Sequence, residues 1–237
     1  MKKIKWEQMR PDEFVAARDA RPVAYLAIGP LEWHSLHLPL GVDPLKAYHH
    51  ICSVAERIGG VVYPPLYFAA DAANRDDLPL RSEAYGGELF ERVVEAKLDF
   101  IASNGFKVIL VISGHGGHLD AVRAVAGRIA EKHGIRVYAT QDEMHCGPEL
   151  YAGDHAGGEE TSMMLHIAPD LVDLSKLPPR GEPLDTAKLV IHSPKPDPRV
   201  QSSAGYGRES CEAITADLAR IVEELLAGKD VRQSGGK

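Results

Sequence analysis

The chain has 237 residues, of which 44% are hydrophobic and 26% are charged, and its formal net charge is −7. This apolar content suffices for one sizeable core, so we expect a single α/β domain over residues 1–228 and a disordered tail over 229–237. The acidic balance, the lack of a long basic run and the lack of an apolar signal or membrane-length segment exclude nucleic acid and membrane partners, which predicts a cytoplasmic protein acting on a small molecule.

Short runs rich in Val, Ile and Tyr alternate along the chain with segments whose apolar residues recur at helical spacing. This alternation is typical of a mostly parallel sheet flanked by helices. In chain order, we expect strands over 23–28, 61–63, 108–112 and 136–139, and helices over 45–58, 90–101, 122–129 and 210–226. The segment 177–206 holds six prolines and little periodicity, which indicates an ordered excursion, a lid or an arm onto a neighbouring subunit.

Polar side chains follow the first and third predicted strands. Glu32 and His34 come after the first strand, and His115 comes after the third. Because the carboxyl ends of parallel strands line one crevice, we expect these side chains to converge. In extended backbone Glu32 and His34 point to the same side, where each could take a different metal ion. Asp43 precedes the next helix, where it could bridge the two ions, cap the helix ahead of Pro44, or do both.

Carboxylates and imidazoles gathered in this way are the ligands of a two-metal hydrolytic site, which indicates an enzyme. The set contains no thiolate, so it suits zinc or manganese, with iron as a third option. Gly116 and Gly117 follow His115, and their backbone amides could hold an anion or a developing oxyanion. The three cysteines of the chain form no paired motif and are interpreted as ordinary thiols.

Three blocks of the sequence resemble the signatures of the creatininase (creatinine amidohydrolase) family. Residues 32–43, Glu-Trp-His-Ser-Leu-His-Leu-Pro-Leu-Gly-Val-Asp, resemble the pattern E-x-H-G-x-H-L-P-x-x-T-D. Residues 113–117, Ser-Gly-His-Gly-Gly, resemble the N-G-H-G-G-N segment, and residues 155–162, His-Ala-Gly-Gly-Glu-Glu-Thr-Ser, resemble H-A-G-x-x-E-T-S. The resemblance implies a three-layer α/β sandwich with a dinuclear metal site, commonly assembled as a homo-oligomer, a hexamer.

The resemblance also implies a division of the metal ligands. By position, it places Glu32 and His115 on one ion, His34 on the other, and Asp43 between the two. Two divalent cations would lower the pKa of a shared water toward neutrality, so that attack on a carbonyl needs no strong protein base.

The second ion then lacks a carboxylate, because creatininase itself has Glu at the position of Gly117. We expect Glu160, from the third block, to complete the site. Glu159 is the alternative, although acidic residues favour the first turn of a helix whatever their function.

Two more histidines gain roles from the resemblance. His155 matches the catalytic histidine, which would pass a proton to the leaving nitrogen as a general acid, and its alternative is a solvated loop residue. His37 is expected to orient a loop or a ligand rather than to bind metal. His49 and His50 are predicted on the surface or flank of their helix, and His118 at the start of the helix after the third strand.

The substrate is predicted least well, because residues 68–79 depart from the corresponding stretch of creatininase and carry several charges. Arg75 could hold a carboxylate or polyol there, and a solvated loop explains the charges equally well. Three functions stay open. They are hydrolysis of a cyclic amide or related C–N bond, hydrolytic C–C opening of a cyclic polyol ketone of the inosose type, and a non-catalytic metal-bound scaffold.

Overall fold

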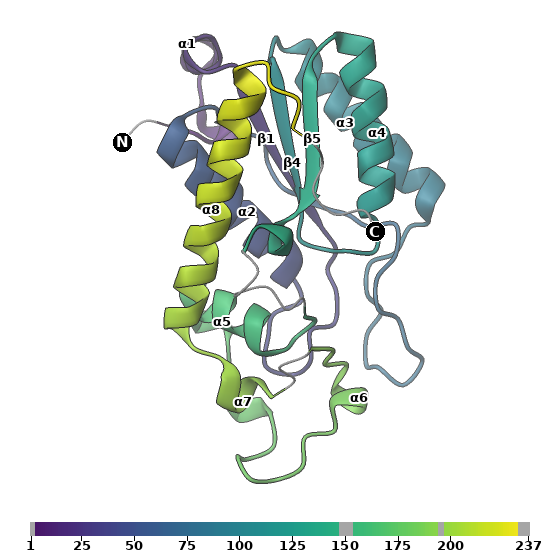
Figure 1. Cartoon of the computed structure of the whole chain (residues 1–237). Helices are drawn as coiled ribbons and strands as arrows, with labels where there is room; N and C mark the ends of the chain where they lie inside the picture. Colours follow the sequence, from purple (N-terminus) through teal and green to yellow (C-terminus); the bar gives the residue numbers. More distant parts are fainter. Residues whose placement is uncertain (1–2, 147–153, 194–196, 232–237) are drawn as a thin grey trace.

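Parallel strands form the central layer of the molecule (Figure 1). The strand order is β2-β1-β4-β5, and β3 pairs with the carboxyl end of β1. Every residue of β1 and β4 is buried, which explains why these strands read as unbroken apolar runs instead of alternating patterns. The strands are β1 (Val23–Gly29), β2 (Val61–Val62), β3 (Leu66–Tyr67), β4 (Val108–Ser113) and β5 (Arg136–Gln141).

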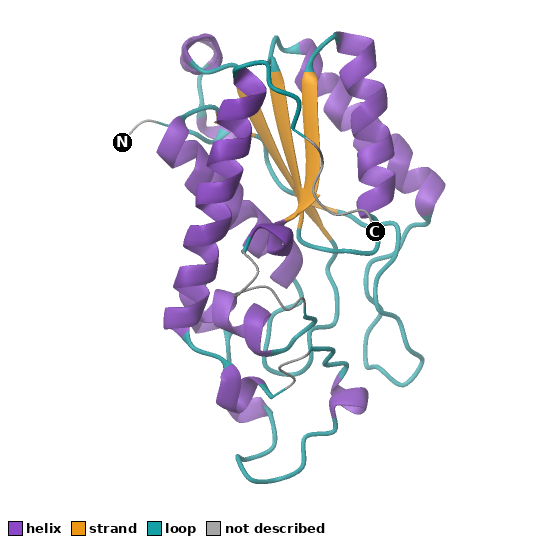
Figure 2. Ribbon diagram, viewed as in Figure 1, coloured by secondary structure: helices purple, strands orange, loops and turns teal. Residues whose placement is uncertain are grey.

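Helices cover both faces of the sheet (Figure 2), so the predicted three-layer α/β sandwich is confirmed. On one face lie α2 (Val42–Ile58) and α8 (Ala204–Leu226), and on the other lie α3 (Gly87–Ser103) and α4 (Leu119–His133). The other helices are α1 (Pro11–Ala20), α5 (Gly158–Ile167), α6 (Thr186–Leu189) and α7 (Pro198–Gln201), with short 3₁₀ helices η1 (Trp6–Gln8), η2 (Asp142–His145), η3 (Pro169–Leu171) and η4 (Leu174–Lys176).

This computed structural model describes residues 3–146, 154–193 and 197–231. No helix within those ranges has both the length and the apolar character needed to cross a membrane. Of the predicted tail, Val231 packs against the core, and residues 232–237 lie outside the described ranges.

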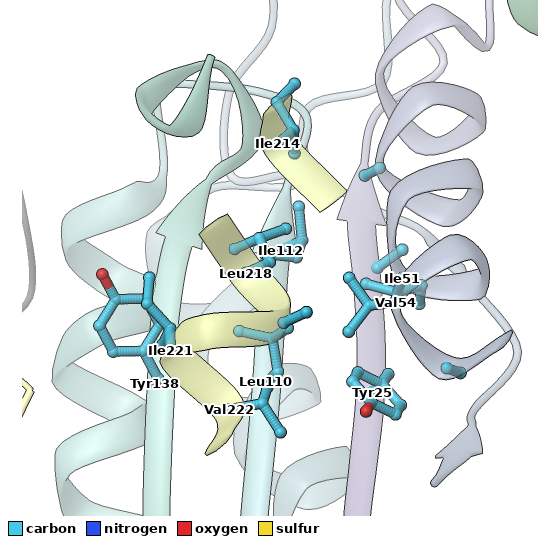
Figure 3. Close-up of a cluster of buried hydrophobic side chains, with 14 of the residues drawn as sticks. Tyr25, Ile51, Val54, Leu110, Ile112, Tyr138, Ile214, Leu218, Ile221 and Val222 are labelled. Carbon is cyan, nitrogen blue, oxygen red and sulfur yellow. The ribbon is translucent and has the colours of Figure 1, made fainter. Parts of the chain in front are cut away.

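Aliphatic and aromatic side chains fill the space between the sheet and the α2–α8 layer (Figure 3). Tyr25 on β1 is fully buried there, and its hydroxyl donates to the carbonyl oxygen of Gly59 at 2.7 Å, so the polar end of the ring is paired. Helix α8 begins before its predicted start, because the side chain of Ser203 caps it by accepting a hydrogen bond from the Tyr206 amide.

Over its described residues, the proline-rich segment 177–206 is an ordered excursion. Leu177, Leu189 and Ile191 are buried in a small apolar cluster with residues of α2 and α5. Arg199 is only 6% exposed, and its guanidinium donates to three carbonyl oxygens of the same segment. Trp33, beside His34, donates its ring N–H to the carbonyl oxygen of Leu189 at 3.3 Å. The excursion therefore packs against the predicted site.

Candidate metal centre

Asp43 lies where the ends of β1 and β4 meet the start of α2. Gly41 occupies the N-cap position of α2 and the helix begins at Val42, so the predicted N-cap role of Asp43 is wrong. The carboxylate is almost fully buried and faces the imidazoles of His34 and His115 instead.

Two glycines let α2 come this close to the strand ends. A Cβ at Gly29, the last residue of β1, would lie 2.7 Å from the Cβ of Asp43. A Cβ at Gly114, directly after β4, would overlap the carbonyl oxygen of Asp43. Any larger residue at either position would displace Asp43, so the glycines are needed for the close backbone approach.

The two oxygens of Asp43 face two different sets of ligands. Oδ1 lies 3.3 Å from His34 Nε2, which is 3.4 Å from Glu160 Oε2. Oδ2 lies 3.4 Å from His115 Nδ1, which is 3.1 Å from Glu32 Oε2. Within each set the ligand atoms lie within 4.8 Å of one another. The structure thus brings together all five residues predicted as metal ligands, in two sets that share Asp43.

Several polar atoms of these sets are buried and form no hydrogen bond with any residue that the structure describes. They are Glu32 Oε2, His34 Nε2 and Asp43 Oδ2. Buried polar atoms are nearly always paired, so three such atoms facing one another leave a place for a partner outside the described residues. Divalent cations are partners of the right kind, because they bind carboxylate oxygens and neutral imidazoles together. The residues present therefore fit a two-ion centre.

Facing carboxylates govern the protonation of both imidazoles in the metal-free protein. Burial lowers the pKa of His34, but Asp43 and Glu160 outweigh burial and raise that pKa to about 9. Burial also lowers the pKa of His115, which Asp43 and Glu32 raise to about 10. Cations must therefore displace protons from the two histidines when they bind.

We expect the metal-free protein to lose stability as the pH rises from 6.5 to about 10. The raised pKa values mean that both protonated histidines stabilise the fold fully below pH 6.5, and this contribution is lost as the pH passes through about 9 and about 10. Metal affinity increases over the same window, since only neutral imidazoles bind metal. Urea denaturation of chelator-treated and metal-loaded protein at several pH values measures both effects. A metal-free protein whose stability stays constant toward pH 10 contradicts the ion-paired arrangement.

A buried lysine that the sequence analysis missed completes the surroundings of Glu160. Lys46 Nζ lies 2.7 Å from Glu160 Oε1, 2.7 Å from Glu143 Oε1 and 3.7 Å from Asp142 Oδ1. Burial lowers the pKa of Lys46, yet these carboxylates raise it well above its usual value, so the lysine is charged. Two features of the sequence could have pointed to Lys46. It lies three residues after Asp43 on the same helix face, and Asp142 and Glu143 directly follow β5.

The two adjacent glutamates at the start of α5 have different partners. Glu160 Oε2 faces His34 and accepts a hydrogen bond from the Ala156 amide at 2.8 Å. Glu159 Oε1 accepts a hydrogen bond from the Tyr206 hydroxyl at 2.8 Å, toward α8. Glu160 therefore lies beside His34 and Asp43, whereas Glu159 is directed toward α8.

A cavity of about 430 Å³ opens beside the ligand sets. Its size is in the range of small-molecule sites. Among the described residues that line it, the carboxylates and imidazoles outnumber other polar groups, and none is Lys or Arg. These residues are Asp43, Gly114, His115, Gly116, Gln141, Glu143, Asp154, His155, Glu160 and His192.

His155 lines this cavity, and the centroid of its ring is 4.3 Å from that of His34. Its Nε2 lies 2.8 Å from the carbonyl oxygen of Trp33, a position from which it donates a hydrogen bond. The backbone of His155 pairs with His192 in an antiparallel bridge, which ties it to the proline-rich excursion. Burial lowers the pKa of His155, so the ring is neutral and Nδ1 carries the free lone pair.

Of Gly116, Gly117 and His37, the residues predicted to contact substrate, Gly116 lines the cavity and the other two are not among its described lining residues. Gly117 adjoins His115. His37 is buried, and its Nε2 is 2.9 Å from the hydroxyl of Thr161. His37 therefore contacts the helix that carries Glu160, in keeping with its predicted orienting role.

Arg75 is placed outside the cavity. Asp77 holds its guanidinium through both carboxylate oxygens, one of them 2.9 Å from Nε. Arg75 also donates to the carbonyl oxygen of Ala187 in the excursion. Since the guanidinium is already engaged, Arg75 gives no reason to expect a carboxylate or polyol substrate.

Other histidines are also better defined by the structure. His50 is fully buried, so its predicted position on the surface or flank of the helix is wrong; α5 and α8 cover that side of α2. His49 is half-buried, which agrees with a flank position. His118 precedes α4 as its N-cap, as predicted. His145 Nδ1 lies 2.7 Å from Asp217 Oδ2 and does not line the cavity.

Two residues beside the site adopt left-handed backbone conformations. Ser35, after His34, has φ of 61°, and Ala156, after His155, has φ of 55°. Such conformations cost about 1–3 kcal/mol in non-glycine residues and cluster at functional sites. The family pattern has Gly at the position of Ser35, and this φ supplies the reason.

Comparison with known proteins assigns the family. The model of the Creatininase family, creatinine amidohydrolase, matches residues 7–227. The chain belongs to the creatininase family. It is 28% identical over 228 residues to a creatinine amidohydrolase of Pseudomonas putida, covering 84% of this chain and 86% of the relative. It is 27% identical over 221 residues to a mycofactocin precursor peptide peptidase of Mycolicibacterium smegmatis, covering 87% and 82%.

The fold of this creatininase-family chain matches that of solved relatives. A crystal structure of creatinine amidohydrolase superposes with a TM-score of 0.80 at 22% identity, covering 95% of this chain and 99% of the other. The named relatives, an amidohydrolase and a peptidase, are both hydrolases. The predictions of the family, the fold and a family enzyme are therefore confirmed.

Proposed function

We propose that this chain is a hydrolase with two divalent metal ions that cleaves a C–N bond in a small polar substrate, such as a cyclic amide. One observation carries the proposal: the two oxygens of the buried Asp43 face separate His–Glu pairs beside a cavity. The relatives support it, because an amidohydrolase and a peptidase both cleave C–N bonds.

Glu32, His115 and Asp43 Oδ2 would hold one ion, and His34, Glu160 and Asp43 Oδ1 the other. Zinc and manganese suit these ligands, and the solved creatininase structures include a manganese form and a zinc–zinc form. When bound, the ions would polarise a substrate carbonyl and activate a water as nucleophile.

The protein's own groups would manage position and protons. His155 would accept a proton from the attacking water on Nδ1, since Nε2 donates to the carbonyl oxygen of Trp33, and would pass that proton to the leaving nitrogen. Lys46 would fix the position of Glu160 by holding its second oxygen. Three ligand carboxylates against two divalent cations would leave one net positive charge, which favours the negative charge that develops on a carbonyl oxygen.

The composition of the cavity favours neutral or cationic substrates over anionic ones. Glu143 and Asp154 line it beside the ligand carboxylates, and no Lys or Arg does so among the described lining residues. A substrate with amide or amine N–H groups could donate to these oxygens, whereas no Lys or Arg among the described lining residues would pair with a phosphate or carboxylate. We therefore expect lactams, formamides and cyclic ureas to be better substrates than acids.

We expect His155→Gln to lower kcat by about 10²–10⁴-fold while leaving the metal content unchanged, because the variant loses a proton carrier and no metal ligand. The assay uses metal-loaded enzyme and a panel of lactams, formamides, cyclic ureas and inosose ketones, with new carboxylate or amine as the readout. Turnover of the ketones alone would assign C–C ring opening. A silent panel with both ions bound would assign the scaffold function and end the hydrolase proposal.

A further inference from the structure

A second cluster of metal-ligand side chains lies outside the main centre. His49 on α2, His166 on α5 and Cys211 on α8 place two imidazoles and a thiol together, with their ligand atoms within 4.8 Å of one another. None of the three lines the main cavity. They line a different cavity, of about 470 Å³, between the three helices.

The side chains of this cluster are available to bind a metal ion. Within the described part of the chain, no hydrogen bond engages the ring nitrogens of His49 or His166. The centroids of the two rings lie 5.9 Å apart, with the ring planes at 86°. Burial and the neighbouring His166 lower the pKa of His49, so its imidazole is neutral, the form that binds metal. Cys211 is only 3% exposed, and in the absence of a cation burial raises its thiol pKa to about 12.

The three ligands come from separate helices that pack against one another. His49 follows Asp43 by six residues on α2, and His166 follows Glu160 by six residues on α5. Six helical residues span about 9 Å, so the cluster lies roughly that far along both helices from the main ligands. An ion here would link the two helices that position Asp43 and Glu160.

We propose that His49, His166 and Cys211 form a separate Zn²⁺ site that clamps α2, α5 and α8 together. Two imidazoles and one thiolate are a ligand set that zinc accepts, and the open cavity leaves its fourth position to water or an added ligand. Glu212 also lines this cavity, but its Oε1 is 2.6 Å from the guanidinium of Arg57. Because this carboxylate is already paired, we do not include it among the ligands.

Cobalt provides a direct test, because a thiolate bound to Co²⁺ gives a charge-transfer band in the near ultraviolet that carboxylate and imidazole ligands do not give. The main centre contains no cysteine among its proposed ligands, so the band reports the new site alone. We expect full-length protein titrated with Co²⁺ to develop this band and Cys211→Ser to lack it. Elemental analysis after loading with Zn²⁺ should find one ion fewer per chain in Cys211→Ser.

Cys52→Ser is the matched control, since Cys52 is a partly buried thiol on α2 outside the cluster, and this variant should keep both the band and the ion. His166→Gln should lose them as Cys211→Ser does. Circular dichroism shows that each variant is folded before it is compared. Absence of the band at saturating Co²⁺ in the wild type, or its persistence in folded Cys211→Ser, overturns the proposal.

Discussion

Asp43→Asn is expected to empty both halves of the main metal centre. Each carboxylate oxygen faces a different His–Glu pair, so one substitution weakens both sets at once. We expect bound metal to fall from two ions per chain toward none, and activity to fall by more than the ~100-fold that loss of a partner outside the ligand set costs. Elemental analysis and the hydrolase assay measure the two effects.

Substitutions at the adjacent glutamates make this prediction specific. Glu160→Gln should lose only the ion beside His34, because Glu160 lies in one ligand set. Glu159→Gln should lose neither, since Glu159 binds the Tyr206 hydroxyl. If Asp43→Asn kept one ion with unchanged affinity, the shared-carboxylate arrangement would be wrong.

Lys46→Met is expected to destabilise the protein by about 3–5 kcal/mol, the range for removing one partner of a buried ion pair. The variant leaves Glu143, Glu160 and Asp142 buried without their shared cation. The loss should be larger in metal-free than in metal-loaded protein, because a bound ion also compensates Glu160. Urea denaturation of both forms measures the difference.

Two further variants separate charge from packing at this position. Adding Glu143→Gln to Lys46→Met should restore part of the stability, since one uncompensated carboxylate is then removed. Lys132→Met removes an exposed ion pair with Asp99 and should change stability little. A Lys46→Met variant as stable as the wild type would show that these buried acids do not need the lysine's charge.

The sequence determined the layer architecture and most of the main centre, because both depend on local patterns. Apolar runs and helical spacing are set by which residues must be buried, and they located the long strands β1, β4 and β5. Polar side chains that follow parallel strands converge at one edge of the sheet, and this rule predicts that Glu32, His34 and His115 lie close together. Glu160 came from the family resemblance alone.

Tertiary structure decided the features that depend on contacts between distant segments. Lys46 reads as a helix surface residue until α5 and η2 place three carboxylates around it. Arg75 is compatible in the sequence with either a substrate ligand or a solvated loop residue, and only the structure shows that Asp77 and the excursion occupy its guanidinium. His49 has no other ligand of the proposed zinc site in its own helix, and it meets His166 and Cys211 only because α5 and α8 pack against α2. Burial and charge pairing are properties of the packed chain, so a local pattern can indicate where such a residue lies but not which distant groups pair with it.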